Sequence, residues 1–208
     1  QVEAGYPVDN MAGAAYIFVR GSDGDWNESQ KIITSDTWPG DLFGYSVAIS
    51  GNTTIIGAPG EDINSQNQNE NAGAAYIFTR ADSGIWNETQ KLTTGDREVG
   101  DQFGVSVAIS GTTAIVGAIW EDIVTSSDDK AGAAYIFTKN GNTWSETQKL
   151  TASDREARDR FGVSVAISED ETTVIVGVDL EDIVTSNDDQ AGAAYIFVRN
   201  DDGTWPEN

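Results

Sequence analysis

Pairs of acidic residues recur along this chain in a pattern that could hold a metal ion. Calcium takes six to eight oxygen ligands, many of them from carboxylates, so a loop that gathers four carboxylates predicts a calcium site. The alternative is structural, because Asp residues also accept backbone N–H bonds and close turns. The candidate calcium ligands are Glu61, Asp62, Glu121, Asp122, Asp128, Asp129, Glu181, Asp182, Asp188 and Asp189.

Two tryptophans break the pattern of the segments around them. Trp38 stands where matching segments carry glutamate, and Trp120 stands where they carry glycine or leucine. Core packing does not demand an aromatic ring at these loop positions, and large amphipathic rings are common contacts for partners and sugars. We therefore predict that Trp38 and Trp120 contact a partner or a sugar; the alternative is that each ring folds over its own sheet.

Composition excludes several kinds of chemistry. The 208 residues include no Cys and no His, which removes disulfides, thiolate metal sites and His-dependent catalysis. Paired carboxylates can hydrolyse glycosides. These acids, however, recur at matching positions in successive segments, whereas catalytic groups usually occur in one segment alone. We therefore expect that the chain is not an enzyme. The net charge of −22 argues against nucleic-acid and anionic-lipid partners, and no apolar run is long enough to span a membrane.

A tandem repeat positions these residues. The string Ala-Gly-Ala-Ala-Tyr-Ile-Phe begins at Ala12, Ala72, Ala131 and Ala191, at spacings of 60, 59 and 60 residues. Within one unit, short β-rich runs predict strands at 103–110, 113–117, 133–138 and 144–150. Four strands per unit correspond to one blade of a β-propeller. We predict an all-β protein in which the tryptophans that open each fourth strand pack between blades: Trp26, Trp86, Trp144 and Trp205.

The order of the motifs resembles the FG-GAP repeat. A Phe-Gly pair opens each unit, and Gly-Ala-Pro or a related triplet ends its second strand. The signature stands at Phe43-Gly44 with Gly57-Ala58-Pro59, at Phe103-Gly104 with Gly117-Ala118-Ile119, and at Phe161-Gly162 with Gly177-Val178-Asp179. The resemblance implies an integrin-α-like propeller, and it is closest to the microbial and algal extracellular proteins of this kind.

One departure concerns calcium. Integrin-type repeats carry a calcium loop in the hairpin between their first two strands, but the hairpins at 50–53 and 110–113 lack carboxylates. Only Glu169, Asp170 and Glu171 stand in the third such hairpin, and we interpret them as a solvated turn.

The array contains about three and a half blades. We expect a single FG-GAP array over residues 1–208, with a half blade at 12–34 and blades at 43–92, 103–150 and 161–208. The resemblance implies seven blades in a closed ring. We expect a segment of a longer propeller or array; the alternative is that two chains pair head to tail.

The loops of a propeller sort onto two faces. Connections between strands two and three, and between blades, share one face, which holds more than half of the 34 acidic residues. The hairpins lie on the other face, together with three glycosylation sequons at Asn27, Asn52 and Asn87.

The leading functional expectation is an extracellular or cell-surface structural and adhesion module. Its acidic face would engage protein partners, further copies of the chain or divalent cations such as calcium, within a filament or surface assembly. The alternative is a carbohydrate-binding, lectin-like propeller in which Trp38 or Trp120 stacks on a sugar ring.

Overall fold

A computed structural model describes residues 11–63, 70–122, 129–180 and 191–208, which form strands and no helix. The strands are β1 (Ala15–Arg20), β2 (Trp26–Ile32), β3 (Ser46–Ser50), β4 (Thr53–Ala58), β5 (Ala74–Arg80), β6 (Trp86–Leu92), β7 (Phe103–Ser110), β8 (Thr113–Ala118), β9 (Ala133–Asn140), β10 (Thr143–Leu150), β11 (Ser164–Ile167), β12 (Thr173–Val178) and β13 (Ala193–Val198). The predicted all-β class is confirmed. Within the described ranges no helix has the length and apolar character to cross a membrane.

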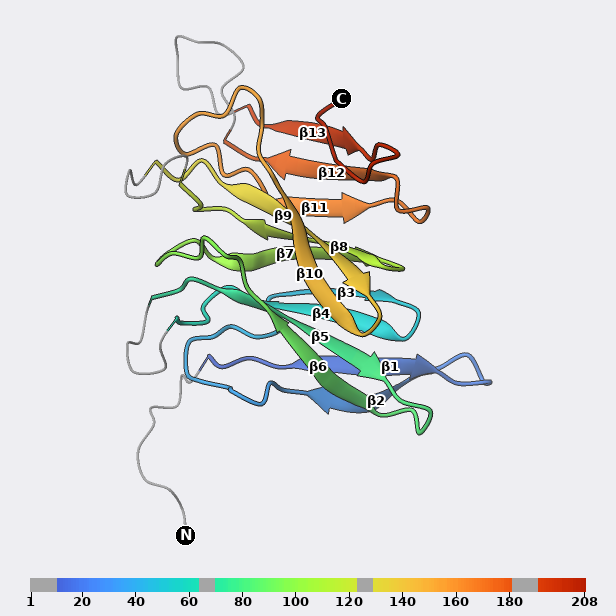
Figure 1. Cartoon of the computed structure of the whole chain (residues 1–208). Coiled ribbons are helices and arrows are strands. Elements are labelled where there is room, and N and C mark those ends of the chain that lie inside the picture. Colours follow the sequence, from blue (N-terminus) through green and yellow to red (C-terminus); the bar gives the residue numbers. More distant parts are fainter. Residues whose placement is uncertain (1–10, 64–69, 123–128, 181–190) are drawn as a thin grey trace.

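The strands form four antiparallel sheets that follow the repeat. The first blade contains β1 and β2, the second β3 to β6, the third β7 to β10, and the fourth β11 to β13. Strands that are consecutive in the chain are neighbours in each sheet. Figure 1 shows the sheets stacked one on another in chain order, from β1 and β2 at the bottom to β13 at the top.

The hydrophobic core lies between successive sheets. At the interface of the second and third blades, Ile55 and Ile77 of the second pack against Val107, Ile109 and Phe137 of the third. The tryptophans predicted to open the fourth strands also lie in these interfaces: Trp86, Trp144 and Trp205 are 2–5% exposed, as predicted, although Trp205 follows β13 and is not part of a strand. Trp26 is different, because it is 67% exposed in the first blade.

A glutamine clasp joins each blade to the next. The side-chain amide of Gln90 donates to the carbonyl of Trp144 at 2.7 Å and accepts from its N–H at 2.8 Å. Gln30 makes the same two bonds to Trp86, and Gln148 makes them to Trp205. The side chain therefore pairs with the edge of the neighbouring sheet much as a backbone strand would.

Glycines allow the blades to approach closely. Gly13, Gly73 and Gly132 form parallel bridges to Phe43, Phe103 and Phe161 of the following blade. A Cβ atom on Gly73 would lie 2.0 Å from the carbonyl oxygen of Phe103, and the φ angle of Gly73 is +84°. Both observations require glycine at this position, which explains why the Ala-Gly pair recurs.

The connections separate onto the two faces that the sequence predicts. Figure 1 shows the hairpin turns of the blades on the right and the connections between blades on the left. We call the left side the loop face. Asn27, Asn52 and Asn87 are exposed, and they belong to the hairpins or to the strands beside them, away from the loop face.

Candidate functional site

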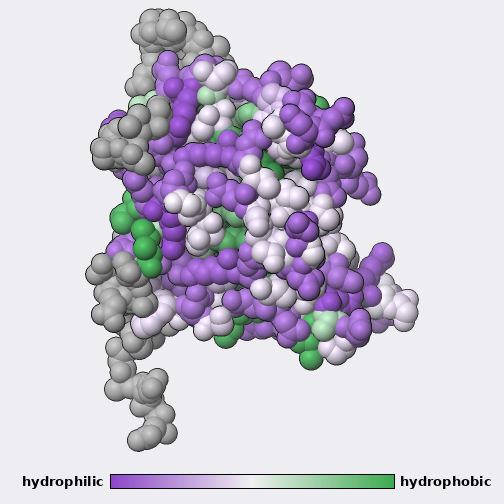
Figure 2. Space-filling view, in the orientation of Figure 1, coloured by the Kyte–Doolittle hydropathy of each residue, from purple (hydrophilic) through white to green (hydrophobic). Residues whose placement is uncertain are grey.

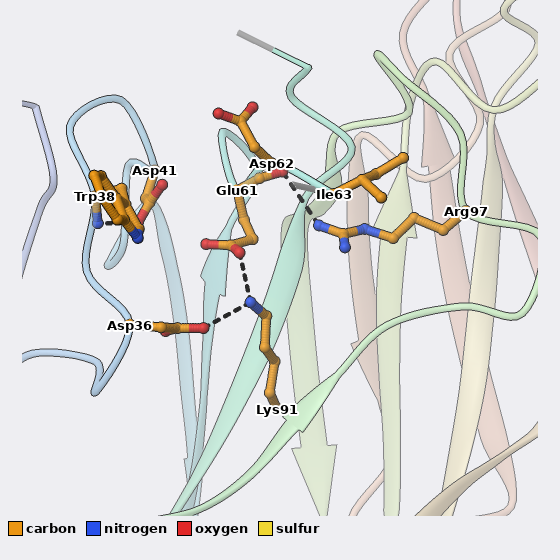
Figure 3. A pocket seen from close by; sticks show the side chains of 8 residues that line it. All are labelled: Asp36, Trp38, Asp41, Glu61, Asp62, Ile63, Lys91 and Arg97. Carbon is orange, nitrogen blue, oxygen red and sulfur yellow. Dashed lines mark hydrogen bonds and ion pairs between the residues drawn. The ribbon is translucent and has the colours of Figure 1, made fainter. Parts of the chain in front are cut away.

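A pocket of about 230 Å³ opens on the loop face beside the second blade (Figure 3). Its walls come from the β2–β3, β4–β5 and β6–β7 connections and from the end of β6. The structure thus brings Trp38, a predicted ligand contact, together with Glu61 and Asp62, which were predicted to bind calcium. The lining residues are Asp36, Trp38, Asp41, Glu61, Asp62, Ile63, Lys91 and Arg97.

An ammonium group organises the floor of the pocket. Lys91 Nζ lies 2.7 Å from Asp36 Oδ2 and 2.5 Å from Glu61 Oε1. The hydroxyl of Tyr76 lies 3.0 Å from Asp36 Oδ1 and 3.2 Å from Glu61 Oε2. Burial raises the pKa of the Asp36 carboxyl, but the hydrogen bond and charge of Lys91 outweigh burial, so the net pKa is lowered.

The same network recurs in the third blade. Lys149 Nζ lies 2.8 Å from Asp96 Oδ2 and 2.5 Å from Glu121 Oε1, and the hydroxyl of Tyr135 lies 3.2 Å from Asp96 Oδ1. These groups therefore belong to the architecture of the repeat. The lysines were not predicted to belong to a site, although they recur within the Gln-Lys-Leu segments at 90–92 and 148–150.

Asp41 closes the turn that presents Trp38. Its Oδ2 accepts the backbone N–H of Trp38 at 2.6 Å, and Asp101 and Asp159 accept the N–H of Glu98 and Glu156 in the same way. Burial raises the pKa of Asp41 to about 7, assisted by the charges of Glu61 and other nearby carboxylates and opposed by the Trp38 hydrogen bond. This part of the acidic pattern has a turn-forming role.

The two predicted tryptophans differ in their surroundings. Trp38 lines the pocket and is 41% exposed, and in Figure 3 its ring stands on the opposite side of the pocket from Arg97. Trp120 is half-buried, with the guanidinium of Arg160 at 5.3 Å and Lys130 Nζ at 5.9 Å from its ring centre. The chain's own cations thus contact Trp120, whereas Trp38 presents its ring to the pocket.

Arg97 adds a hydrogen-bond donor that was not predicted from the sequence. Its Nη2 donates to the backbone carbonyl of Glu61 at 3.3 Å. Its Nε is buried, and no hydrogen-bond partner for it is found in the part of the chain that the structure describes. Burial lowers the pKa of this guanidinium. A buried N–H without a partner is unfavourable, and Arg155 and Arg160 also have a buried Nε for which no partner is found in the described ranges.

The described acidic pairs have structural partners. Glu61 and Glu121 are bound by lysines, as above, while Asp62 Oδ1 accepts the N–H groups of Glu70 and Asn71, and Asp122 Oδ1 accepts that of Lys130. Asp129 accepts the N–H of Arg158 through its backbone carbonyl. Within the described ranges, no three acidic side chains are grouped to hold a metal ion. Asp128, Glu181, Asp182, Asp188 and Asp189 lie outside the described residues, and calcium binding stays a prediction.

The hairpin carboxylates of the fourth blade form internal contacts. Asp170 Oδ1 accepts from the hydroxyls of Ser168 and Thr172 and closes the turn. Glu171 Oε2 reaches the third blade, where it accepts from the hydroxyls of Thr112 and Thr113. The turn interpretation holds for Asp170, and Glu171 forms a contact between blades.

Comparison with known families agrees with these repeated units. The FG-GAP repeat profile matches residues 26–78, 86–137 and 144–197. The chain belongs to the FG-GAP repeat family. Each match runs from the fourth strand of one blade through the third strand of the next, so the family unit is offset from the sheet by one strand. A comparison with functionally curated proteins finds no match.

Solved structures similar to this FG-GAP protein show the β-propeller fold. A Lactobacillus plantarum protein superposes with a TM-score of 0.57 at 13% sequence identity, covering 96% of this chain and 51% of its own. The "putative 6-phosphogluconolactonase" of Bacteroides uniformis superposes with a TM-score of 0.60 at 15% identity, covering 94% of this chain and 50% of its own. This FG-GAP chain therefore spans about half the length of each.

The similarity to the Bacteroides uniformis structure corrects the expectation about catalysis. We inferred from the recurrence of the acidic residues that the chain is not an enzyme, but a structure of the same fold carries the name of an enzyme. Repetition across blades thus does not exclude catalysis by a propeller. At 15% identity the similarity concerns the fold alone, and it transfers no activity to this chain.

Proposed function

We propose that this chain is the recognition module of an extracellular adhesion protein, and that it binds a glycan in the Trp38 pocket. The observation that supports this proposal is the combination of a 41% exposed indole ring with carboxylates and cations around one small cavity. A module that binds a glycan in this pocket could also bind a protein partner or assemble on a cell surface, as expected from the sequence.

The pocket chemistry suits a sugar ring. The apolar face of a pyranose can stack on an indole, while its hydroxyl groups donate to carboxylates and accept from ammonium and guanidinium groups. Asp36, Glu61 and Asp62 supply acceptors, and Lys91 and Arg97 supply donors. The cavity volume of about 230 Å³ lies below the roughly 300–1,000 Å³ of drug-sized pockets, which favours one ring of a longer glycan.

The position of the pocket suits adhesion. Both the pocket and the acidic loops lie on the loop face, whereas the sequons at Asn27, Asn52 and Asn87 lie with the hairpins (Figure 1). Glycans attached there would leave the loop face open to a partner. Extracellular location is part of the proposal, and it is supported by the occurrence of FG-GAP repeats in extracellular proteins.

A glycan array followed by calorimetric titration of the best ligand tests the proposal. We expect Trp38→Ala to weaken binding about tenfold or more, because loss of an aromatic contact of roughly 1.4 kcal/mol corresponds to that factor. Trp120→Ala is the matched control and should leave the affinity unchanged, since its ring is engaged by Arg160 and Lys130. A silent array, or equal affinities for Trp38→Ala and the unsubstituted protein, would refute the proposal.

A further inference from the structure

A second cavity, of about 460 Å³ and largely apolar, lies beside the first blade. β1 forms one wall, with Tyr16 and Phe18, and strands β3 and β4 form the other, with Val47 and Ile49. All four side chains are 49–60% exposed. In the parts of the chain that the structure describes, β1 pairs with β2 along one edge and no strand pairs with its other edge. We call this region the edge groove. Figure 2 shows a mostly hydrophilic face with several hydrophobic patches, two of them at its lower end, where β1 and β2 lie.

The matching positions in the complete blades are buried. Tyr76 and Tyr135, which correspond to Tyr16, are at most 1% exposed, and Phe78 and Phe137, which correspond to Phe18, are at most 3% exposed. Val107 and Ile109, which correspond to Val47 and Ile49, are each 8% exposed, and the second corresponding pair, Val165 and Ile167, is half-buried. The protein therefore contains two examples of what covers such a surface.

The cover in each example is a hairpin that begins with Phe-Gly. Its second strand pairs with the third strand of its blade, as β8 pairs with β9 from Ala118↔Ala133 to Thr113↔Thr138. Its phenylalanine contacts the tyrosine and phenylalanine of that third strand, with ring centres of Phe103 and Tyr135 5.6 Å apart. Its outer face covers the first strand of the next blade, as Ile55 packs with Val107 and Ile109.

We propose that the edge groove is the acceptor site for such a hairpin, consisting of Phe-Gly and the first two strands of an FG-GAP blade. The second strand of the hairpin adds to the open edge of β1, and main-chain hydrogen bonds continue the sheet. The Phe ring covers Tyr16 and Phe18, and the aliphatic face covers Val47 and Ile49. One such hairpin would therefore pair with the open edge of β1 and cover both apolar walls of the edge groove.

Close backbone contacts make the recognition specific. At the two complete interfaces, Ser46 Oγ donates to the carbonyl of Gly104 at 2.8 Å, and Ser106 Oγ donates to that of Gly162 at 2.7 Å. Gly44, the matching residue, lines the edge groove. A Cβ atom on Gly117 would lie 2.1 Å from the Gly162 carbonyl oxygen. A docked hairpin must therefore carry glycine at this position, because even one methyl group would collide with the Gly44 backbone.

The test uses the peptide of residues 103–118, labelled with a fluorophore, and the full chain. We expect saturable binding by fluorescence anisotropy, together with slower amide hydrogen exchange in β1. The same peptide with Gly117→Ala should bind at least about tenfold more weakly, which corresponds to a loss of 1.4 kcal/mol. On the protein, Val47→Asp should also weaken binding, while Val99→Asp, which is equally exposed on the β6–β7 connection, should not.

The controls separate docking from non-specific adhesion of an apolar peptide. A peptide that merely adheres would be indifferent to one added methyl group and would leave the exchange of β1 unchanged. Equal binding by the Gly117→Ala peptide, unchanged binding to Val47→Asp, or unprotected β1 amides would each overturn the proposal. None of these results depends on glycan binding at Trp38.

Discussion

Substitution of Gln90 by alanine should weaken the coupling between the second and third blades. The substitution removes two hydrogen bonds, of 2.7 and 2.8 Å, to the backbone of Trp144. It leaves both backbone groups of that residue without their partner at an interface where the Trp144 side chain is 3% exposed.

The expected loss follows from these contacts. A neutral hydrogen bond contributes roughly 0.5–1.5 kcal/mol, and burying an unsatisfied group adds a further penalty. Gln90 is half-buried, so water can replace part of what is lost. We expect the free energy of unfolding to fall by about 2 kcal/mol, which lowers the urea midpoint by about 1 M for an m value of roughly 2 kcal/mol per M.

Urea denaturation followed by tryptophan fluorescence and circular dichroism measures this change. Gln90→Glu is an informative variant, because its carboxylate still accepts the Trp144 N–H but cannot donate to the carbonyl; it should lose about 1 kcal/mol or more. Ser145→Ala, an exposed change on β10, is the control. If Gln90→Ala lies within about 0.5 kcal/mol of the unsubstituted protein, the range of ordinary surface substitutions, the clasp does not stabilise the interface.

Four further outcomes are expected. Phe103→Ala should lower the free energy of unfolding by about 3–5 kcal/mol in the same assay, because a 1% exposed ring is removed from the core. Gly104→Ala should prevent normal folding, seen as loss of the near-ultraviolet circular dichroism signal, since φ is +93° and a Cβ atom would lie 2.3 Å from a carbonyl oxygen of the preceding blade. Burial raises the folded-state pKa of Asp101 from 3.8 to about 7, so this carboxyl contributes stability that is complete below about pH 4 and is lost as the pH rises through 7; Asp101→Asn should therefore be more stable than the unsubstituted protein at pH 8 and equal to it near pH 4 in urea titrations. Glu98→Trp, which places an indole at the position matching Trp38, should raise the number of glycan sites from one to two in calorimetry, and an unchanged stoichiometry would count against the role of Trp38.

Much of the fold could be predicted from sequence because the repeat samples the same pattern several times. The strands predicted at 103–110 and 144–150 agree with β7 and β10 to within one residue. Alternation of side chains, turn residues and a fixed period all indicate the same sheet, and these signals are local. The exposure of Trp26 was not foreseen, because it depends on which surface faces the residue and not on the pattern around it.

The site was less predictable for a physical reason. Trp38 was found because it breaks the repeat, but the partners of Glu61 lie 15 and 30 residues away in the chain, at Tyr76 and Lys91. A count of charges gives the number of acids, but it does not show which lysine or backbone N–H each carboxylate contacts. The recurring lysine at the end of the fourth strand was the available signal, and its meaning becomes clear only when the strand order is known.

The glutamine clasp and the glycine bridges are the same at successive interfaces, which bears on how such proteins change through evolution. A duplicated gene segment encodes a unit whose two sides already fit its neighbours, and a deletion rejoins surfaces that fit equally well. Such changes in length leave each interface intact. Selection can then act on the number of units while the contacts at each interface stay the same.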